Sequence, residues 1–172
     1  MSTLKVDTVQ STGGSTIFTH SSGLFKPNAL ICQVVATNTD QDIAADTTTT
    51  VQWETVDVDT GSFWDSSNHR YTPTVAGWYY VSGIMRFSFD SAPAAWITIN
   101  VRKNGTDVLI YQWQSTSSEV LGASMLPIPS TFVQLNGGGD YIDTSVRFEE
   151  AGLIHDNANY PSSMSIQLVH AT

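Results

Sequence analysis

The sequence has one cysteine, Cys32, so no internal disulfide can stabilise the fold. Cys32 lies in the apolar stretch ALICQVVA, where a buried and unreactive thiol is expected. No run of apolar residues is long enough to cross a bilayer, and MSTLKVDTVQSTGGS lacks the basic region and apolar core of a signal peptide. We therefore expect a chain that is made in the cytoplasm without a signal peptide and is not inserted into a membrane.

Charge is also scarce, at 13% of 172 residues, and it is unbalanced, with 7 Lys and Arg against 16 Asp and Glu. The resulting formal charge of -9 repels a phosphate backbone, so nucleic acid is not an expected partner. With few charges, the water-facing surface must consist mainly of Ser, Thr, Asn and Gln. Such a surface is more typical of a structural or extracellular particle protein than of a cytosolic enzyme.

What the sequence has is a hydrophobic content of 41%, enough for one good-sized core, and a series of short alternating patterns from Asn28 onward. No helical period of useful length is present. The alternation predicts strands with one buried face. Those faces are expected to contain Leu30, Cys32, Val34 and Ala36; Tyr79, Val81, Met85, Phe87 and Phe89; Ile142, Val146 and Phe148; and Met164, Ile166 and Leu168.

The clearest hairpin is AWITINVRKNGTDVLIYQW, in which Ile97, Ile99 and Val101 alternate with polar residues before Asn104-Gly105. Asn-Gly is the preferred two-residue hairpin turn because both positions tolerate positive φ. Asn104 also begins a glycosylation sequon, which the turn explains without any sugar. About eight to ten short strands without helices predict a β-sandwich.

Two segments follow from these patterns, a head at residues 28–172 and an N-terminal segment at residues 1–27. The N-terminal segment is rich in Ser, Thr and Gly and has one strand-like piece, residues 3–9, with apolar Leu4, Val6 and Val9. It has too few apolar residues to fold alone. We interpret it as an attachment arm that becomes ordered against other chains, with a disordered leader as the alternative.

Aromatic residues, an aspartate and a glycine recur in the head at fixed spacing, at Trp53, Asp59, Trp64, Tyr71, Gly77 and Tyr79. This spacing resembles the signature of the complement C-one-q globular head. That domain is a jelly roll shared with the tumour necrosis factor (TNF) superfamily. The stretches VRKNGTDV and FVQLNGGGDYIDTSVRF resemble a hairpin and a strand pair of the same family, and the likeness covers about Leu30 to Thr172.

The resemblance implies an all-β fold, a ten-stranded jelly roll that assembles as a homotrimer. A weaker argument from the residues agrees, because the strand Tyr79 to Phe89 and five tryptophans supply more apolar surface than one sandwich of this size hides. Self-association in a closed ring is the natural outcome. Two departures from the family are Val81 and Gly83, which stand where further aromatics are usual.

One stretch resembles an enzyme motif: Val58-Asp59-Thr60-Gly61-Ser62 has the form of the catalytic segment of aspartic proteases. Such proteases need two carboxylates that share a proton, and this chain has no second copy of the motif. A dimeric protease that uses Asp59 is the enzyme alternative. Because Asp59 falls on the signature position where a turn is expected, we predict a turn residue and a chain that is not an enzyme.

Residues that could bind a metal are scattered along the sequence. No two of the four histidines, His20, His69, His155 and His170, have ligand spacing, so zinc is not expected. Asp57 with Asp59, and the loop at residues 155–159, offer oxygen ligands for calcium, but Asp and Asn in loops are usually turn residues. We predict no metal and no cofactor.

Jelly-roll trimers with Ser/Thr/Gly-rich leaders are typical of virion appendages, and STLKVDTVQSTGG resembles segments of structural proteins from cyanobacterial phages. We therefore predict a non-enzymatic bacteriophage protein located in the virion: a tail fibre, head fibre or capsid decoration protein. Its arm would dock to other virion proteins, and its head would stabilise the particle or attach to a host glycan or protein. Residues 113–119 and 152–160 are the candidate receptor loops. The alternative is a bacterial surface or spore-coat adhesin.

Overall fold

The computed structural model describes residues 29–36, 40–89, 95–114, 124–155 and 161–172, together with the backbone of three strands before residue 28. Within this described part of the chain every regular element is a strand, and no helix is long and apolar enough to span a membrane. The chain divides into two compact units, Met1–Leu30 and Ile31–Thr172.

The first unit contains a small antiparallel sheet of β1 (Thr8–Gln10), β2 (Thr16–Ser21) and β3 (Leu24–Pro27), in the order β1-β2-β3. Its register pairs Val9 with Phe18 and Phe18 with Pro27. Of the three apolar residues assigned to the arm, Val9 lies in β1, and Leu4 and Val6 lie outside the described residues. The described part of this segment is therefore a sheet, where the sequence indicated only one strand-like piece.

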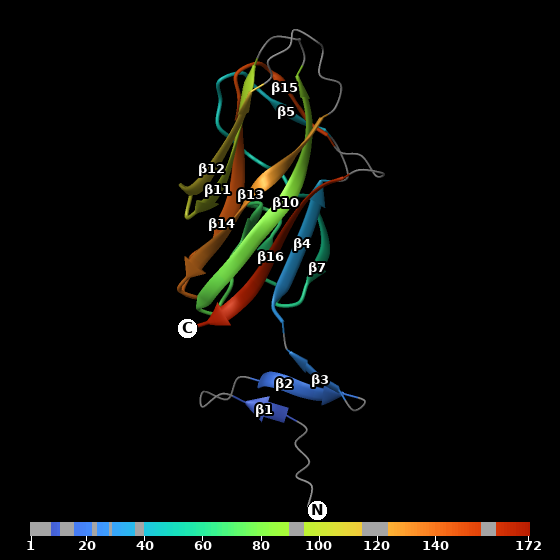
Figure 1. The fold of residues 1–172 in the computed structure, drawn as a ribbon, viewed down its shortest axis with the longest axis vertical. Coiled ribbons are helices and arrows are strands. Elements are labelled where there is room, and N and C mark those ends of the chain that lie inside the picture. The colour runs from blue at the N-terminus through green and yellow to red at the C-terminus, as the bar shows by residue number, and fades with distance from the viewer. Residues whose placement is uncertain are drawn as a thin grey trace, which may run out of the picture. The chain divides into compact units, whose positions relative to one another are not determined.

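The second unit, which we call the head, is a sandwich of two antiparallel sheets (Figure 1). The seven-stranded sheet has the order β5-β15-β10-β16-β4-β7, with β13 also paired to β10. Its strands are β4 (Ile31–Ala36), β5 (Gln41–Ile43), β7 (Thr55–Asp59), β10 (Gly77–Phe89), β13 (Ser124–Leu135), β15 (Gly152–Ile154) and β16 (Ser162–Ala171).

The six-stranded sheet has the order β12-β11-β14-β9-β8, with β6 also paired to β14. Its strands are β6 (Thr49–Thr50), β8 (Trp64–Asp65), β9 (Arg70–Tyr71), β11 (Trp96–Lys103), β12 (Thr106–Gln114) and β14 (Ile142–Phe148). The predicted all-β sandwich is confirmed. The strands outnumber the ten implied by the resemblance because several, such as β8 and β9, are pieces of only two residues.

The core lies between the sheets and contains the faces that alternation predicted, except that Leu168 packs against it half-buried and Leu30, also half-buried, is not part of it. β10 is its central strand, paired with β13 along one side and with β16 and then β15 along the other. Every second residue of β10 points into the core. Burial of apolar surface there stabilises the fold by about 25 cal/mol for each Å² removed from water. Fully buried side chains on the predicted faces are Cys32, Val34, Tyr79, Val81, Met85, Phe87, Ile97, Ile99, Val101, Ile142, Val146, Phe148 and Met164.

The hairpin turn is also as predicted. Asn104 and Gly105 connect β11 to β12 with φ values of 53° and 75°. Both values lie in the left-handed region that a tight hairpin requires. The Asn104 side chain stabilises the turn, because its Nδ2 donates to Asp140 at 2.8 Å and its Oδ1 accepts from the Tyr141 amide at 2.9 Å.

Gly83 interrupts the apolar row of β10 for a steric reason. A Cβ at this position would collide with the carbonyl oxygen of Ser163 on β16, so only glycine allows the two strands to approach here. On the other side of β10, the pairing with β13 shifts register between Val81 and Gly83, as in a β-bulge. Glycine at this position is therefore explained by strand packing.

One ion pair is largely enclosed by the six-stranded sheet. Arg102 forms a two-pronged contact with Asp143, from Nε to Oδ1 at 2.9 Å and from Nη2 to Oδ2 at 2.6 Å. Its Nη2 also donates to Thr50 Oγ1 at 2.9 Å. The two side chains are only 13% and 8% exposed. This pair ties β11 and β14 to the short strand β6.

Candidate functional site

The outward face of the seven-stranded sheet carries the largest side chains that the head leaves exposed. On β10, Trp78 and Ile84 alternate with buried residues and are 41% and 36% exposed. On the neighbouring β13, Phe132 is 54% exposed and lies opposite Tyr80, with ring centroids 5.2 Å apart. Met125, also on β13, is 42% exposed. We call these five residues the apolar face.

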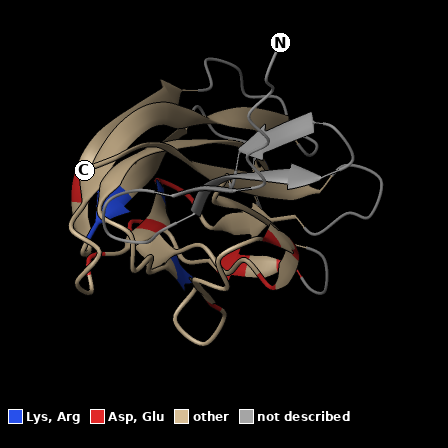
Figure 2. Ribbon diagram, turned by 90° about the horizontal axis from the view of Figure 1, so that it is seen from below, with Lys and Arg blue, Asp and Glu red and all other residues tan. Residues whose placement is uncertain are grey.

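Charged residues are scarce around the apolar face. In β10, β13 and β16, three adjacent strands that the structure describes in full, Arg86 is the only Lys, Arg, Asp or Glu. Figure 2 shows the same property on the ribbon, where most of the head is tan and charged positions form only small coloured segments. A surface that is apolar and carries so little charge is typical of a protein interface.

A second exposed apolar segment lies on β12, the edge strand of the six-stranded sheet. Val108, Leu109 and Ile110 follow one another and are 43%, 37% and 55% exposed. An edge strand has unpaired backbone groups, and three successive apolar side chains make it a second candidate contact surface.

The signature residues take up core and turn positions. Trp53, Tyr71 and Tyr79 are fully buried, and Tyr71 meets the ring of Tyr79 edge-on at 5.8 Å. Trp53 Nε1 donates to Thr144 Oγ1 at 2.9 Å, and the Tyr79 hydroxyl donates to the Val75 carbonyl at 2.8 Å. Trp64 packs against the core, and Gly77 begins β10, where a Cβ would collide with the His170 carbonyl oxygen.

Asp59 caps the turn that follows β7. Its Oδ1 accepts from the Gly61 amide at 3.2 Å, and its Oδ2 accepts from the Trp64 amide at 2.7 Å. Within the described residues, Asp59 makes no hydrogen bond to another carboxyl group. Both oxygens are used by backbone donors of its own turn, which is a structural role and not the arrangement of a carboxylate pair that shares a proton.

Cys32 is fully buried beside this turn. Burial, and then the negative charge of Asp59, raise the pKa of its thiol from 9.0 to about 12. Burial alone raises the pKa of Tyr79 from 10.0 to about 12. A thiol with so high a pKa is a poor nucleophile.

These raised pKa values predict a loss of stability in alkali. In the unfolded chain the thiol titrates near 9.0, whereas in the folded head it keeps its proton until about pH 12. The stabilisation is complete below pH 9 and is lost as the pH rises from 9 to 12. We expect urea titrations to give a decreasing free energy of unfolding over this range. A native protein that reacts with a thiol reagent as fast as free cysteine at neutral pH would contradict the assignment.

The candidate metal and receptor segments lie partly beyond the described residues. Residues 115–123 and 156–160 are outside them, which leaves Trp113 and Gln114 in β12, Gly152–Ile154 in β15 and His155 as the described positions of the two predicted loops. Among the described residues, no group of three or more His, Cys, Asp or Glu side chains could hold a metal ion. Asp57 lies in β7 with Asp59.

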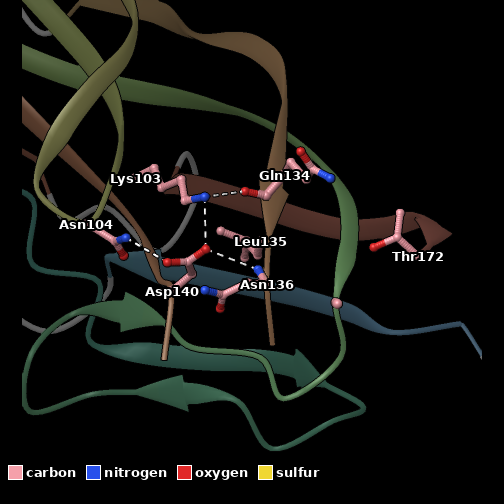
Figure 3. Close-up of a pocket in the computed structure, with 8 residues that line it drawn as sticks. Lys103, Asn104, Gln134, Leu135, Asn136, Asp140 and Thr172 are labelled. Atoms are coloured by element: carbon pink, nitrogen blue, oxygen red, sulfur yellow. Dashed lines mark hydrogen bonds and ion pairs between the residues drawn. The ribbon is translucent and has the colours of Figure 1, made fainter. Parts of the chain in front are cut away.

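A pocket of about 510 Å³ lies between the hairpin turn, the end of β13 and the C-terminal Thr172 (Figure 3). Its charged groups bind one another, since Lys103 Nζ lies 2.8 Å from Asp140 Oδ2 and donates to the Gln134 carbonyl at 2.8 Å. Hydrogen bonds from Lys103 and then Asn104 hold the pKa of Asp140 below its usual value. These contacts stabilise this end of the sandwich.

A polar cluster lies at the other end of β10, and the sequence did not indicate it. His155 Nδ1 is 3.0 Å from Asp40 Oδ2, and His155 Nε2 is 2.8 Å from Ser88 Oγ. In the sequence, His155 belonged only to a candidate calcium or receptor loop, and no pattern indicated Asp40 or Ser88. Separations of 115 and 67 residues leave no local spacing by which the three could have been found.

Two facing antiparallel sheets, closed around one core and connected in this order, define a jelly-roll sandwich of the TNF-like class. A similar solved structure is that of Eiger TNF from S. frugiperda, with a TM-score of 0.60 over 82% of this chain and 92% of that chain. The two sequences are 11% identical, so the likeness shows the fold alone. No protein-family model and no curated protein matches the chain.

Proposed function

We propose that the chain is a structural protein of a virion, with a homotrimeric head and an N-terminal segment that attaches it to the particle. The observation that carries the proposal is the apolar face, in which Trp78 and Phe132 are 41% and 54% exposed on β10 and β13, two strands whose only charged residue is Arg86. Exposure of such a surface to water is unfavourable, and burial against other copies of the chain removes the cost.

A trimer is favoured because the head offers two different apolar surfaces. A cyclic ring of three copies uses a heterologous interface, in which one surface of each copy contacts another surface of the next. The apolar face and the exposed edge strand β12 supply such a pair. A two-fold dimer would need only one self-complementary surface and would leave the other exposed.

The assignment to a virion is supported by composition and by the leader. The scarcity of charge and the absence of a disulfide suit a particle protein that is made in a cytoplasm and stabilised by assembly. The Ser/Thr/Gly-rich leader resembles those of bacteriophage tail fibres, head fibres and capsid decoration proteins. In this role residues 1–27 dock to capsid or tail proteins, and the head contacts solvent or a host glycan or protein.

The assembly is tested by light scattering on the full chain and on residues 28–172. We expect a trimer from both, because the proposed contacts lie in the head. A trimer that needs residues 1–27 would move the assembly into that segment, and a monomer in both cases would overturn the trimer. A dimer would also overturn it and would favour the aspartic-protease alternative at Asp59.

The location is tested by immunogold electron microscopy with antibodies against the purified head. Gold on virus particles, lost when residues 1–27 are deleted, is the expected result. Gold on the cell envelope or on spore coats would overturn the virion assignment and favour the adhesin alternative.

A further inference from the structure

The polar cluster of Asp40, Ser88 and His155 has the connectivity of a nucleophile, a base and an orienting carboxylate. Ser88 is the penultimate residue of β10, His155 follows β15, and Asp40 precedes β5. These three strands are neighbours at one end of the seven-stranded sheet (Figure 1). The strand pairing therefore brings the three side chains together on the sheet's outward face.

The hydrogen bonds fix which imidazole nitrogen carries the proton. A carboxylate can only accept, so the contact at 3.0 Å requires that His155 Nδ1–H donates to Asp40 Oδ2. In the neutral ring, Nε2 then has a free lone pair and accepts from the Ser88 hydroxyl at 2.8 Å. This is the tautomer in which a histidine can remove a proton from a serine.

The backbone of His155 is held in place on both sides. Its amide donates to the Arg86 carbonyl at 2.9 Å, and its own carbonyl accepts from Ser162 Oγ at 3.3 Å. Ser88 lies between Phe87 and Phe89, whose rings are 5.6 Å apart and are buried in the core. The side chains of His155 and Asp40 are 18% and 39% exposed, so the base is positioned by the sheet and remains open to solvent.

Arg86 supplies a positive charge beside the cluster. It lies on the same face of β10 as Ser88, two residues away, and the register of β10 with β15 continues to place it opposite His155. A guanidinium on this face of the strand can stabilise negative charge that develops on a carbonyl oxygen during attack by Ser88.

We propose that Ser88 is a reactive nucleophile that cleaves small carboxylic esters, with His155 as its general base and Asp40 as the orienting carboxylate. This activity goes beyond the structural role proposed above and does not depend on it. It would also overturn the sequence-based prediction that the chain is not an enzyme.

The reaction proceeds in two balanced steps. In the first, Ser88 Oγ forms a bond to the acyl carbon while its proton moves to His155 Nε2; the ester C–O bond then breaks, and the same proton leaves with the alcohol. In the second, water gives a proton to Nε2 and attacks the acyl-serine, the acyl bond to Oγ breaks, and the proton returns to Oγ. The products are one alcohol and one carboxylic acid.

The test is covalent labelling of the full-length protein with a fluorophosphonate, in which Ser88 Oγ would displace fluoride from phosphorus. We expect one adduct per chain, located at Ser88 by peptide mass spectrometry. The same protein should hydrolyse p-nitrophenyl acetate, and Ser88→Ala should abolish both signals. His155→Gln removes the general base, and Asp40→Asn removes the carboxylate that orients it. Each variant should slow labelling on the order of 10²-fold.

The matched control is Ser82→Ala, which removes a serine from the same face of the same strand, outside the cluster. It should label and hydrolyse as the unmodified chain does, and thermal unfolding should show that every variant is folded. The proposal is overturned if Ser88 is not labelled, if several serines are labelled equally, or if folded His155→Gln labels at the full rate. The last two results would leave the three residues as a structural hydrogen-bond chain.

Discussion

Replacement of Phe132 by glutamate is expected to convert the proposed trimer of the head into a monomer, with about a threefold fall in solution mass. Phe132 is 54% exposed in a single chain, so a charge there can stay hydrated in the monomer and the fold should survive. In the proposed trimer the carboxylate would be buried in the apolar face next to Tyr80, where an unpaired charge costs several kcal/mol at each interface. Light scattering on the folded variant measures the mass.

Two controls separate this effect from general damage. Phe132→Leu keeps the face apolar and should remain trimeric. Thr98→Glu places the same charge on β11, on the outward side of the other sheet, beside Arg147 in the pairing with β14, and should also remain trimeric. The proposed interface would be refuted if Phe132→Glu kept the full mass while Thr98→Glu lost it.

The second large effect is expected at the enclosed ion pair. Asp143→Asn would leave the guanidinium of Arg102 without its counter-charge at a site where the two side chains are 13% and 8% exposed. Breaking such a pair by removal of one partner is expected to cost about 3 kcal/mol of unfolding free energy. Chemical denaturation of the variant and of the unmodified chain gives the difference.

A matched pair of residues provides the control for this prediction. Asp46 also forms an ion pair with Arg147, from Oδ1 to Nη2 at 2.7 Å, but these two side chains are 64% and 39% exposed. Asp46→Asn is therefore expected to change stability by less than about 1 kcal/mol. Equal losses of unfolding free energy in both variants would show that the contribution of the Arg102–Asp143 pair to stability does not depend on its burial.

The two roles proposed for the head, assembly and ester cleavage, use different side chains. The proposed assembly would bury exposed apolar side chains such as Phe132 and Ile110. The proposed chemistry uses Ser88 and His155, which must stay open to solvent in the assembled protein. Labelling and mass measurements on the same preparation therefore show whether one head can have both properties.

The sequence by itself determined the strands and the core of the head. Residues such as Ile97, Ile99 and Val101 alternate with polar ones, and a period of two allows only a strand with one buried face. Asn104-Gly105 fixed a hairpin because few other residue pairs adopt positive φ twice in succession. These features depend on neighbours in the chain, so local pattern was sufficient.

Only the tertiary structure decided the roles of residues whose contacts are far away in the sequence. Asp59 resembled a catalytic carboxylate in sequence, and the fold showed that both its oxygens cap a turn. His155 was one of four scattered histidines until the pairing of β10, β15 and β5 placed Ser88 and Asp40 on either side of its ring. Strand register sets such contacts, and register arises from the packing of the whole sandwich, because a shift of one residue would turn each side chain to the opposite face.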